Sequence, residues 1–167
     1  MSPLRRLYEC CGLLSGLFLV AICVIICAQI IARLLGTLIP ASDEFAAYAM
    51  AASGFLGLPF ALHRGAHIRV GMLFKALPPK GCHAMEVIST LVGLLVAAYL
   101  AWHCTLFVFE TYSFNEVSTG MLPIPLWIPQ SSMVLGTVVL VVAMTERLVT
   151  VLRGRTFETA SDTAMSE

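Results

Sequence analysis

Two histidines and four basic residues stand together in the segment HRGAHIRVGMLFKALPPK, at residues 63–80. Residue types of this kind suit a metal site, an anion site or a membrane-surface segment. His63 and His67 are four residues apart, a spacing that would place two metal ligands on one face of a helix. Gly65 lies between them, however, and no third ligand is near in the sequence. We therefore interpret both histidines as polar residues of a membrane surface, with a metal site as the alternative.

A third histidine, His103, indicates a different chemistry, because an imidazole nitrogen can ligate haem iron in a cytochrome b-like membrane anchor. Such a site needs a second ligand at the same depth, and the charge pattern places the other three histidines on the opposite side of the membrane. Met50 and Met133 are the remaining candidates for that second ligand. Haem binding therefore stays an alternative, and the sequence leaves the roles of His63, His67 and His103 open.

Other reactive groups give no pattern of a catalytic or metal centre. The six cysteines include no C-x-x-C pair, and most lie in or beside apolar segments, as is typical of small buried hydrophobic residues. The chain has no Walker loop, no nucleophile elbow and no H-E-x-x-H zinc motif. We expect no enzymatic activity and no resident metal or cofactor.

The chain that carries these residues is too apolar for an ordinary soluble domain. Of its 167 residues, 59% are hydrophobic and 12% are charged, and the mean hydropathy is +0.89. One core of so short a chain cannot bury this much apolar surface, so lipid must solvate most of it. The net charge of zero gives no electrostatic support for a nucleic-acid partner.

Four segments are long and apolar enough to cross a bilayer, which needs about 20 residues per helix. The expected fold is an all-α membrane protein with four transmembrane helices in a single domain over residues 1–153. The helices are expected at about residues 11–35, 45–62, 85–109 and 127–151. The first is expected to be a retained helix, because its apolar stretch exceeds the roughly 7–15 residues of a signal peptide. The polar tail at 154–167 is expected to be disordered.

Charges near the ends of the spans predict the orientation, since Lys and Arg collect on the cytoplasmic side. Of the ten Lys and Arg residues, only Arg33 falls outside the N-terminal segment, the loop between spans two and three, and the C-terminal end. Both termini are therefore expected in the cytoplasm. The two outer loops carry the acidic residues Asp43, Glu44, Glu110 and Glu116.

This orientation makes the basic run at 63–80 a topology determinant and surface anchor. Residues 67–77 are expected to form a short amphipathic helix on the cytoplasmic headgroups, ended by two prolines. Its apolar face would consist of Val70, Leu73, Phe74 and Leu77. The polar residues expected to hold the segment at the surface are Arg64, His67 and Arg69.

Ionisable residues deep in a bilayer point to functional sites, yet the middles of all four spans are nearly free of them. Arg33 lies near the outer end of span one, where it can reach the headgroups or pair with Asp43, Glu44 or Glu110. Gln29 lies one turn earlier on the same face. A four-helix exporter that worked as an independent dimer would need a carboxylate in mid-membrane to hold its coupling ion. We therefore disfavour that class of protein.

Small residues favour close helix packing, which replaces the hydrophobic driving force that lipid does not supply. Pro59 is expected to kink span two. The expected interface residues are the stripe Ala49, Ser53, Gly57 and Ala61, the GxxxG pair Gly12 and Gly16, and Trp127 at the start of span four. Their partner is either another helix of this chain or another protein.

Three features taken together resemble a known family. They are FLGLPFALHRGAHIRV at residues 55–70, the acidic pair Asp43-Glu44 that opens span two, and STGMLPIPLWIP at residues 118–129. This combination is similar to the small membrane subunit of tripartite ATP-independent periplasmic (TRAP) transporters, the DctQ-like family. The resemblance extends from span one through span four.

The resemblance implies an accessory subunit without a transport site of its own. It would brace and assemble with a large polytopic subunit that carries a small organic acid together with sodium ions. A periplasmic substrate-binding protein would deliver that substrate. The expected location is the inner membrane of a bacterial or archaeal cell, in contact with membrane lipid. A haem b-type membrane anchor of an electron-transfer enzyme is the alternative function.

Overall fold

The computed structural model describes residues 3–64 and 79–153, and within them all regular structure apart from one isolated β-bridge is helical. The helices are α1 (Pro3–Leu34), α2 (Ser42–His63), α4 (Pro79–Ser113) and α5 (Trp127–Leu152). Each of these four is long and apolar enough to cross a membrane, which confirms the four predicted spans. The expected surface helix at 67–77 and the tail at 154–167 lie outside the described residues.

Helices α1 and α4 begin earlier than the apolar pattern predicted. They contain 32 and 35 residues, so at 1.5 Å per residue they are about 48 and 52 Å long. A bilayer core is only about 30 Å thick. The additional turns of α1 are polar and are supported by an ion pair across one turn, in which Arg5 Nε lies 3.2 Å from Glu9 Oε1.

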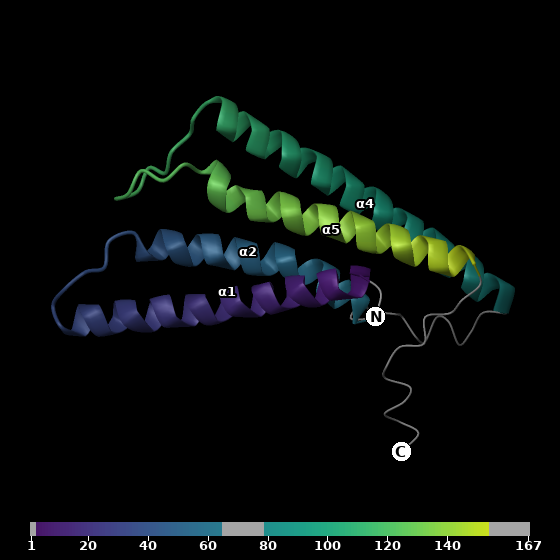
Figure 1. The fold of residues 1–167 in the computed structure, drawn as a ribbon, viewed down its shortest axis with the longest axis horizontal. Coiled ribbons are helices and arrows are strands. Elements are labelled where there is room, and N and C mark those ends of the chain that lie inside the picture. Colours follow the sequence, from purple (N-terminus) through teal and green to yellow (C-terminus); the bar gives the residue numbers. More distant parts are fainter. Residues whose placement is uncertain (1–2, 65–78, 154–167) are drawn as a thin grey trace, which may run out of the picture.

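The four helices form a single row in the order α1, α2, α5, α4 (Figure 1). Helix α2 packs on α1, α5 packs on α2, and α4 packs on α5. The two outer helices are therefore far more exposed: 6% and 11% of the most apolar window of α1 and α4 is buried, against 33% in both α2 and α5. Most of the apolar surface of α1 and α4 must meet lipid or another protein.

The two ends of the row, taken along the helix axes, differ in charge. The start of α1, the end of α2, the start of α4 and the end of α5 lie together at one end (Figure 1). This is the basic end, which carries Arg5, Arg6, Arg64 and Arg153. The loops from α1 to α2 and from α4 to α5 lie at the acidic end, which carries Asp43, Glu44, Glu110 and Glu116. This separation agrees with an even number of crossings.

Near the basic end, Tyr8 connects the first turns of α1 to the rest of the row. Its side chain is 1% exposed and packs in a cluster with Leu62 of α2 and Met144 of α5. The Tyr8 hydroxyl donates a 2.8 Å hydrogen bond to Oε2 of Glu146. This pair gives no signal in the sequence, because its members are 138 residues apart.

Helices α2 and α5 approach closely where Gly136 meets the backbone of Phe55. A Cβ atom at Gly136 would overlap the carbonyl oxygen of Phe55. Pro59 has no N–H, so that carbonyl lacks the donor that an α-helix normally supplies four residues later. The glycine therefore lets α5 lie against a freed carbonyl, in an arrangement that suits a weak Cα–H···O=C contact.

Helix α4 turns a stripe of small residues toward α5. The buried positions recur at spacings of three, four and seven residues, which is the pattern of left-handed helix packing. They include Thr90, Ala97, Ala101, Cys104 and Thr111. A Cβ atom at Gly93 would lie 3.2 Å from Cε of Met144 of α5. The opposite face of α4 is consequently the outer edge of the row.

The Gly136→Ala substitution tests the contact between α2 and α5. Because the added methyl group would overlap backbone, we expect a loss of about 1–3 kcal/mol in the free energy of unfolding. The measurement is thermal unfolding of the detergent-purified protein, in which the midpoint should fall by several degrees. Gly54→Ala is the matched control, since a Cβ atom at Gly54 meets nothing within 4 Å. Equal midpoints for both variants would contradict the close approach.

Candidate functional site

The small-residue stripe of α2 packs in part against α1 of the same chain. Ser15 Oγ donates a 2.8 Å hydrogen bond to the backbone carbonyl of Ser53, and Ser53 Oγ donates a 3.0 Å bond to the carbonyl of Ser15. A Cβ atom at Gly57 would lie 3.0 Å from Ser15 Oγ. Ala49 is buried and Ala61 is half-buried. Ser53 and Gly57 therefore hold the two helices together within the chain.

The GxxxG pair of α1 is divided between two environments. A Cβ atom at Gly12 would come within 2.5 Å of the Phe60 ring of α2. Gly16 is exposed, and a Cβ atom there would meet nothing within 4 Å among the described residues. Gly12 thus contributes to packing inside the chain, whereas Gly16 lies on an open surface. Contact of any of these residues with another protein stays a prediction.

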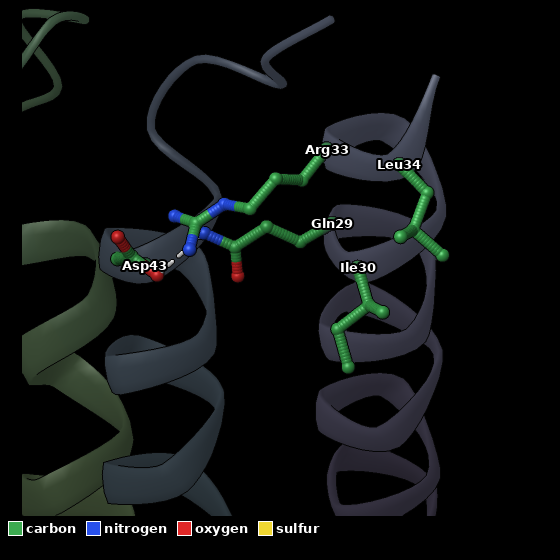
Figure 2. Close-up of a pocket in the computed structure, with 5 residues that line it drawn as sticks. All are labelled: Gln29, Ile30, Arg33, Leu34 and Asp43. Atoms are coloured by element: carbon green, nitrogen blue, oxygen red, sulfur yellow. Dashed lines mark hydrogen bonds between the residues drawn. The ribbon is translucent and has the colours of Figure 1, made fainter. Parts of the chain in front are cut away.

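A polar pocket of about 330 Å³ lies at the acidic end, between the last turns of α1 and the start of α2 (Figure 2). Gln29 Nε2 donates a 2.9 Å hydrogen bond to Oδ1 of Asp43. The Arg33 side chain extends beside Gln29 toward Asp43 (Figure 2). Within the described parts of the chain it forms no ion pair with a carboxylate within 4.0 Å. Ile30 and Leu34 complete the lining.

The geometry of this pocket suits the membrane surface rather than a transport path. Its charged groups lie at the end of the row, where Arg33 can reach water or headgroups. The spacing of Gln29 and Arg33 predicts that they share one helix face, and both line the same pocket. Arg33 was expected to pair with Asp43, Glu44 or Glu110, and of these three Asp43 lines the pocket.

Glu44 connects the start of α2 to the loop between α4 and α5. Its Oε2 accepts hydrogen bonds from Ser118 Oγ and, at 3.4 Å, from the Tyr48 hydroxyl. Ser118 Oγ in turn accepts a 3.2 Å bond from the N–H of Gly120. A Cβ atom at Gly120 would overlap the Glu44 carboxylate. The acidic pair and the loop motif, noted separately in the sequence, therefore meet in space.

The α4–α5 loop has an ordered backbone of its own. Val117 and Pro125 form an antiparallel bridge, next to a 2.8 Å bond from Ser118 N–H to the carbonyl of Ile124. Trp127, which begins α5, packs edge-on against Tyr112 of α4, with ring centroids 5.7 Å apart. Such aromatic residues are typical of the headgroup level of a bilayer.

Of the basic run at 63–80, the described residues include His63 and Arg64, whose side chains contact different aromatic rings. His63 lies in the last turn of α2, with its ring centroid 5.3 Å from that of Tyr8. Arg64 lies with its guanidinium carbon 5.1 Å from the centroid of the Phe60 ring, a cation–π contact. His67 and Arg69 lie outside the described residues. Among the residues that are described, no three His, Cys, Asp or Glu side chains are grouped to hold a metal ion.

Comparison with known families gives one match over most of the chain. The family model for the DctQ component of tripartite ATP-independent periplasmic transporters matches residues 22–154. The match begins within α1 and includes the whole of α2, α4 and α5. It therefore contains the Glu44–Ser118 contact and the polar pocket. A search of curated proteins gave no significant match.

The Gly57→Leu substitution should force α1 and α2 apart, because the larger side chain would occupy the space of Ser15. We expect the free energy of unfolding to fall by about 1–3 kcal/mol, while insertion into the membrane is unchanged. Thermal unfolding and the yield in the membrane fraction measure the two effects. Gly54→Leu, at an exposed position of the same helix, should leave the midpoint within about a degree of wild type. A similar loss in both variants would contradict the α1–α2 contact.

Glu44→Ala should release the α4–α5 loop from α2. Hydrogen bonds to a charged group contribute about 1.5–3 kcal/mol, so we expect the amides of Ser118 and Leu126 to exchange with deuterium about tenfold faster. Hydrogen–deuterium exchange of the protein in nanodiscs measures this effect. Asp43→Ala is the control, because Asp43 accepts its hydrogen bond from α1 rather than from the loop. Unchanged exchange in Glu44→Ala would show that this contact does not hold the loop.

Proposed function

The chain belongs to the DctQ component family of TRAP transporters, a family of transporter subunits rather than enzymes, and from that premise we propose that it braces and assembles with the large transport subunit. The observation that carries this proposal is the open row of helices. Two of the four helices have most of their surface exposed, which leaves ample area for a larger membrane partner.

The distribution of charge supports an accessory role over a transport site in this chain. Among the described residues, the acidic and basic side chains of the four helices lie toward the two ends of the row. Ion-coupled transporters hold their ions and substrates near the middle of the membrane. Here the middle of the row is occupied by contacts between small residues instead. Substrate and coupling ions would therefore belong to the large subunit.

In the complete system, the large subunit would move a small organic acid together with sodium ions. A periplasmic binding protein would deliver that acid at the acidic end of the row. The basic end would face the cytoplasm, with both termini and the segment at 67–77 on that side, in accordance with the collection of Lys and Arg there. The location would be the inner membrane of a bacterial or archaeal cell.

The haem-anchor alternative has no observation in its favour. His103 lies on the exposed face of α4, and its ring neighbour is Tyr99 at 4.3 Å between centroids. A visible absorption spectrum of the purified protein tests the alternative directly. A Soret band that disappears in a His103→Ala variant would establish it, and a colourless protein would end it.

Affinity purification of the chain from its native membrane tests the proposed function. We expect a much larger polytopic membrane protein to co-purify in a constant ratio, because exposed helix faces of this extent need a protein or lipid neighbour. Deletion of the gene should reduce uptake of the transported acid to background. Recovery of the chain alone, together with normal uptake in the deletion strain, would rule the proposal out.

A further inference from the structure

The outer edge of α4 carries three side chains with polar atoms on one face. Tyr99, Trp102 and His103 are spaced by three and four residues and are therefore neighbours on the helix surface. Tyr99 is 68% and Trp102 is 66% exposed, and His103 is exposed as well. Because Ala97 and Ala101 face α5, these three side chains point away from the row.

This face lies deep in the membrane. The edge-on pair of Tyr112 and Trp127 marks the headgroup level at the acidic end. His103 precedes Tyr112 by nine residues, which corresponds to about 13 Å along the helix. Half of a bilayer core is about 15 Å. His103 therefore lies inside the hydrocarbon core, between the headgroups of the acidic end and the bilayer centre, and Tyr99 lies one turn deeper.

None of the three side chains has a hydrogen-bond partner among the described residues. The rings of Tyr99 and His103 contact each other. The threonines of the same helix behave differently. Thr90, Thr105 and Thr111 each donate to a carbonyl one turn earlier in α4. Hydrocarbon offers no partner to a hydroxyl, an indole N–H or an imidazole, so leaving them in lipid is unfavourable.

The other edge of the row, α1, has no such groups on its open face. Apart from the thiols of Cys23 and Cys27, which are weak hydrogen-bond donors, its exposed residues along the span are mainly aliphatic and include Leu13, Leu17, Leu19, Val20, Val24 and Ile31. Its hydroxyl at Ser15 is paired with α2. Lipid tails solvate a face of this kind without cost, and interhelical hydrogen bonds are what distinguish protein contacts in the membrane. The two edges therefore have different expected neighbours.

We infer that the Tyr99–Trp102–His103 face of α4 is the surface that docks the large transport subunit, and that the outer edge of α1 faces lipid. The inference rests on the proposed function, which supplies the partner. That partner must present hydrogen-bonding groups at the same depth within the hydrocarbon core, either polar side chains or the carbonyls of an interrupted helix. The docking face is then one helix wide and lies on the α4 edge of the row.

Site-specific photocrosslinking in the assembled complex tests this assignment. A benzophenone amino acid replaces Trp102 or Tyr99 in one set of variants and Leu17 or Val24 in the other, so that positions of similar exposure are compared. We expect the α4 positions to crosslink to the large subunit about tenfold more strongly than the α1 positions, since benzophenone reacts only with atoms in contact.

A second measurement uses hydrogen-bonding variants of the same face. His103→Leu should reduce co-purification of the large subunit several-fold, and His103→Gln, which keeps donor and acceptor atoms, should restore most of it. Membrane yield of the chain alone should be equal in both variants, because the side chain makes no hydrogen bond within the described chain.

The outcomes separate the inference from the proposed function. Crosslinks from Leu17 or Val24 instead, in a complex that still co-purifies, would overturn the assignment of the face and leave the accessory role intact. Crosslinks from α4 only to a second copy of this chain would overturn it too. Failure of the wild-type chain to bring down any large membrane protein would refute the proposed function and the inference with it.

Discussion

The packing of this chain depends on one constraint: in a bilayer, apolar side chains gain no hydrophobic free energy when they move from lipid into a contact between helices. Helices associate instead through close backbone contact and hydrogen bonds. The chain satisfies this requirement at a few positions. Ser15 and Ser53 exchange hydrogen bonds with each other's backbone, and Gly136 lies against the carbonyl that Pro59 leaves free in α2. The surrounding leucines, isoleucines and valines make the helices soluble in the bilayer but do not decide which helix neighbours which.

Polar side chains connect the helices at the two ends of the row. Tyr8 and Glu146 connect α1 to α5 near the basic end, and Glu44 and Ser118 connect α2 to the α4–α5 loop at the acidic end. Each contact joins segments that do not follow one another in the chain. The middle is left to small residues, so polar contacts connect the helices at the two ends, and the exterior between them is apolar apart from the Tyr99–Trp102–His103 face of α4. That organisation is consistent with a family whose members are components of a larger transporter.

The number of spans was predictable because their apolar lengths suffice on their own, whereas the helix starts and the helix order were not. Helix α1 begins at Pro3 rather than near residue 11 because a polar turn stabilised by Arg5 and Glu9 continues it. The order α1, α2, α5, α4 could not be predicted from the sequence, because helices that are apolar all round have no apolar stripe to indicate which face is buried. The Ser53–Gly57 stripe was visible in the sequence, but its partner was not. His103 drew attention as a possible ligand, and only its place on the open face of α4 indicates a different role.

The single-layer arrangement has a mechanical consequence. With helix diameters of about 10 Å, four helices side by side make a slab about 40 Å long and about 10 Å thick in the plane of the membrane. Such a slab contacts lipid along both broad sides. Tilting it relative to the bilayer normal therefore displaces more acyl chains than tilting a round bundle of the same mass. Joined by one narrow side to the large subunit, as proposed above, the slab would lengthen the lever against which the bilayer resists rocking and would steady that subunit without contacting its substrate.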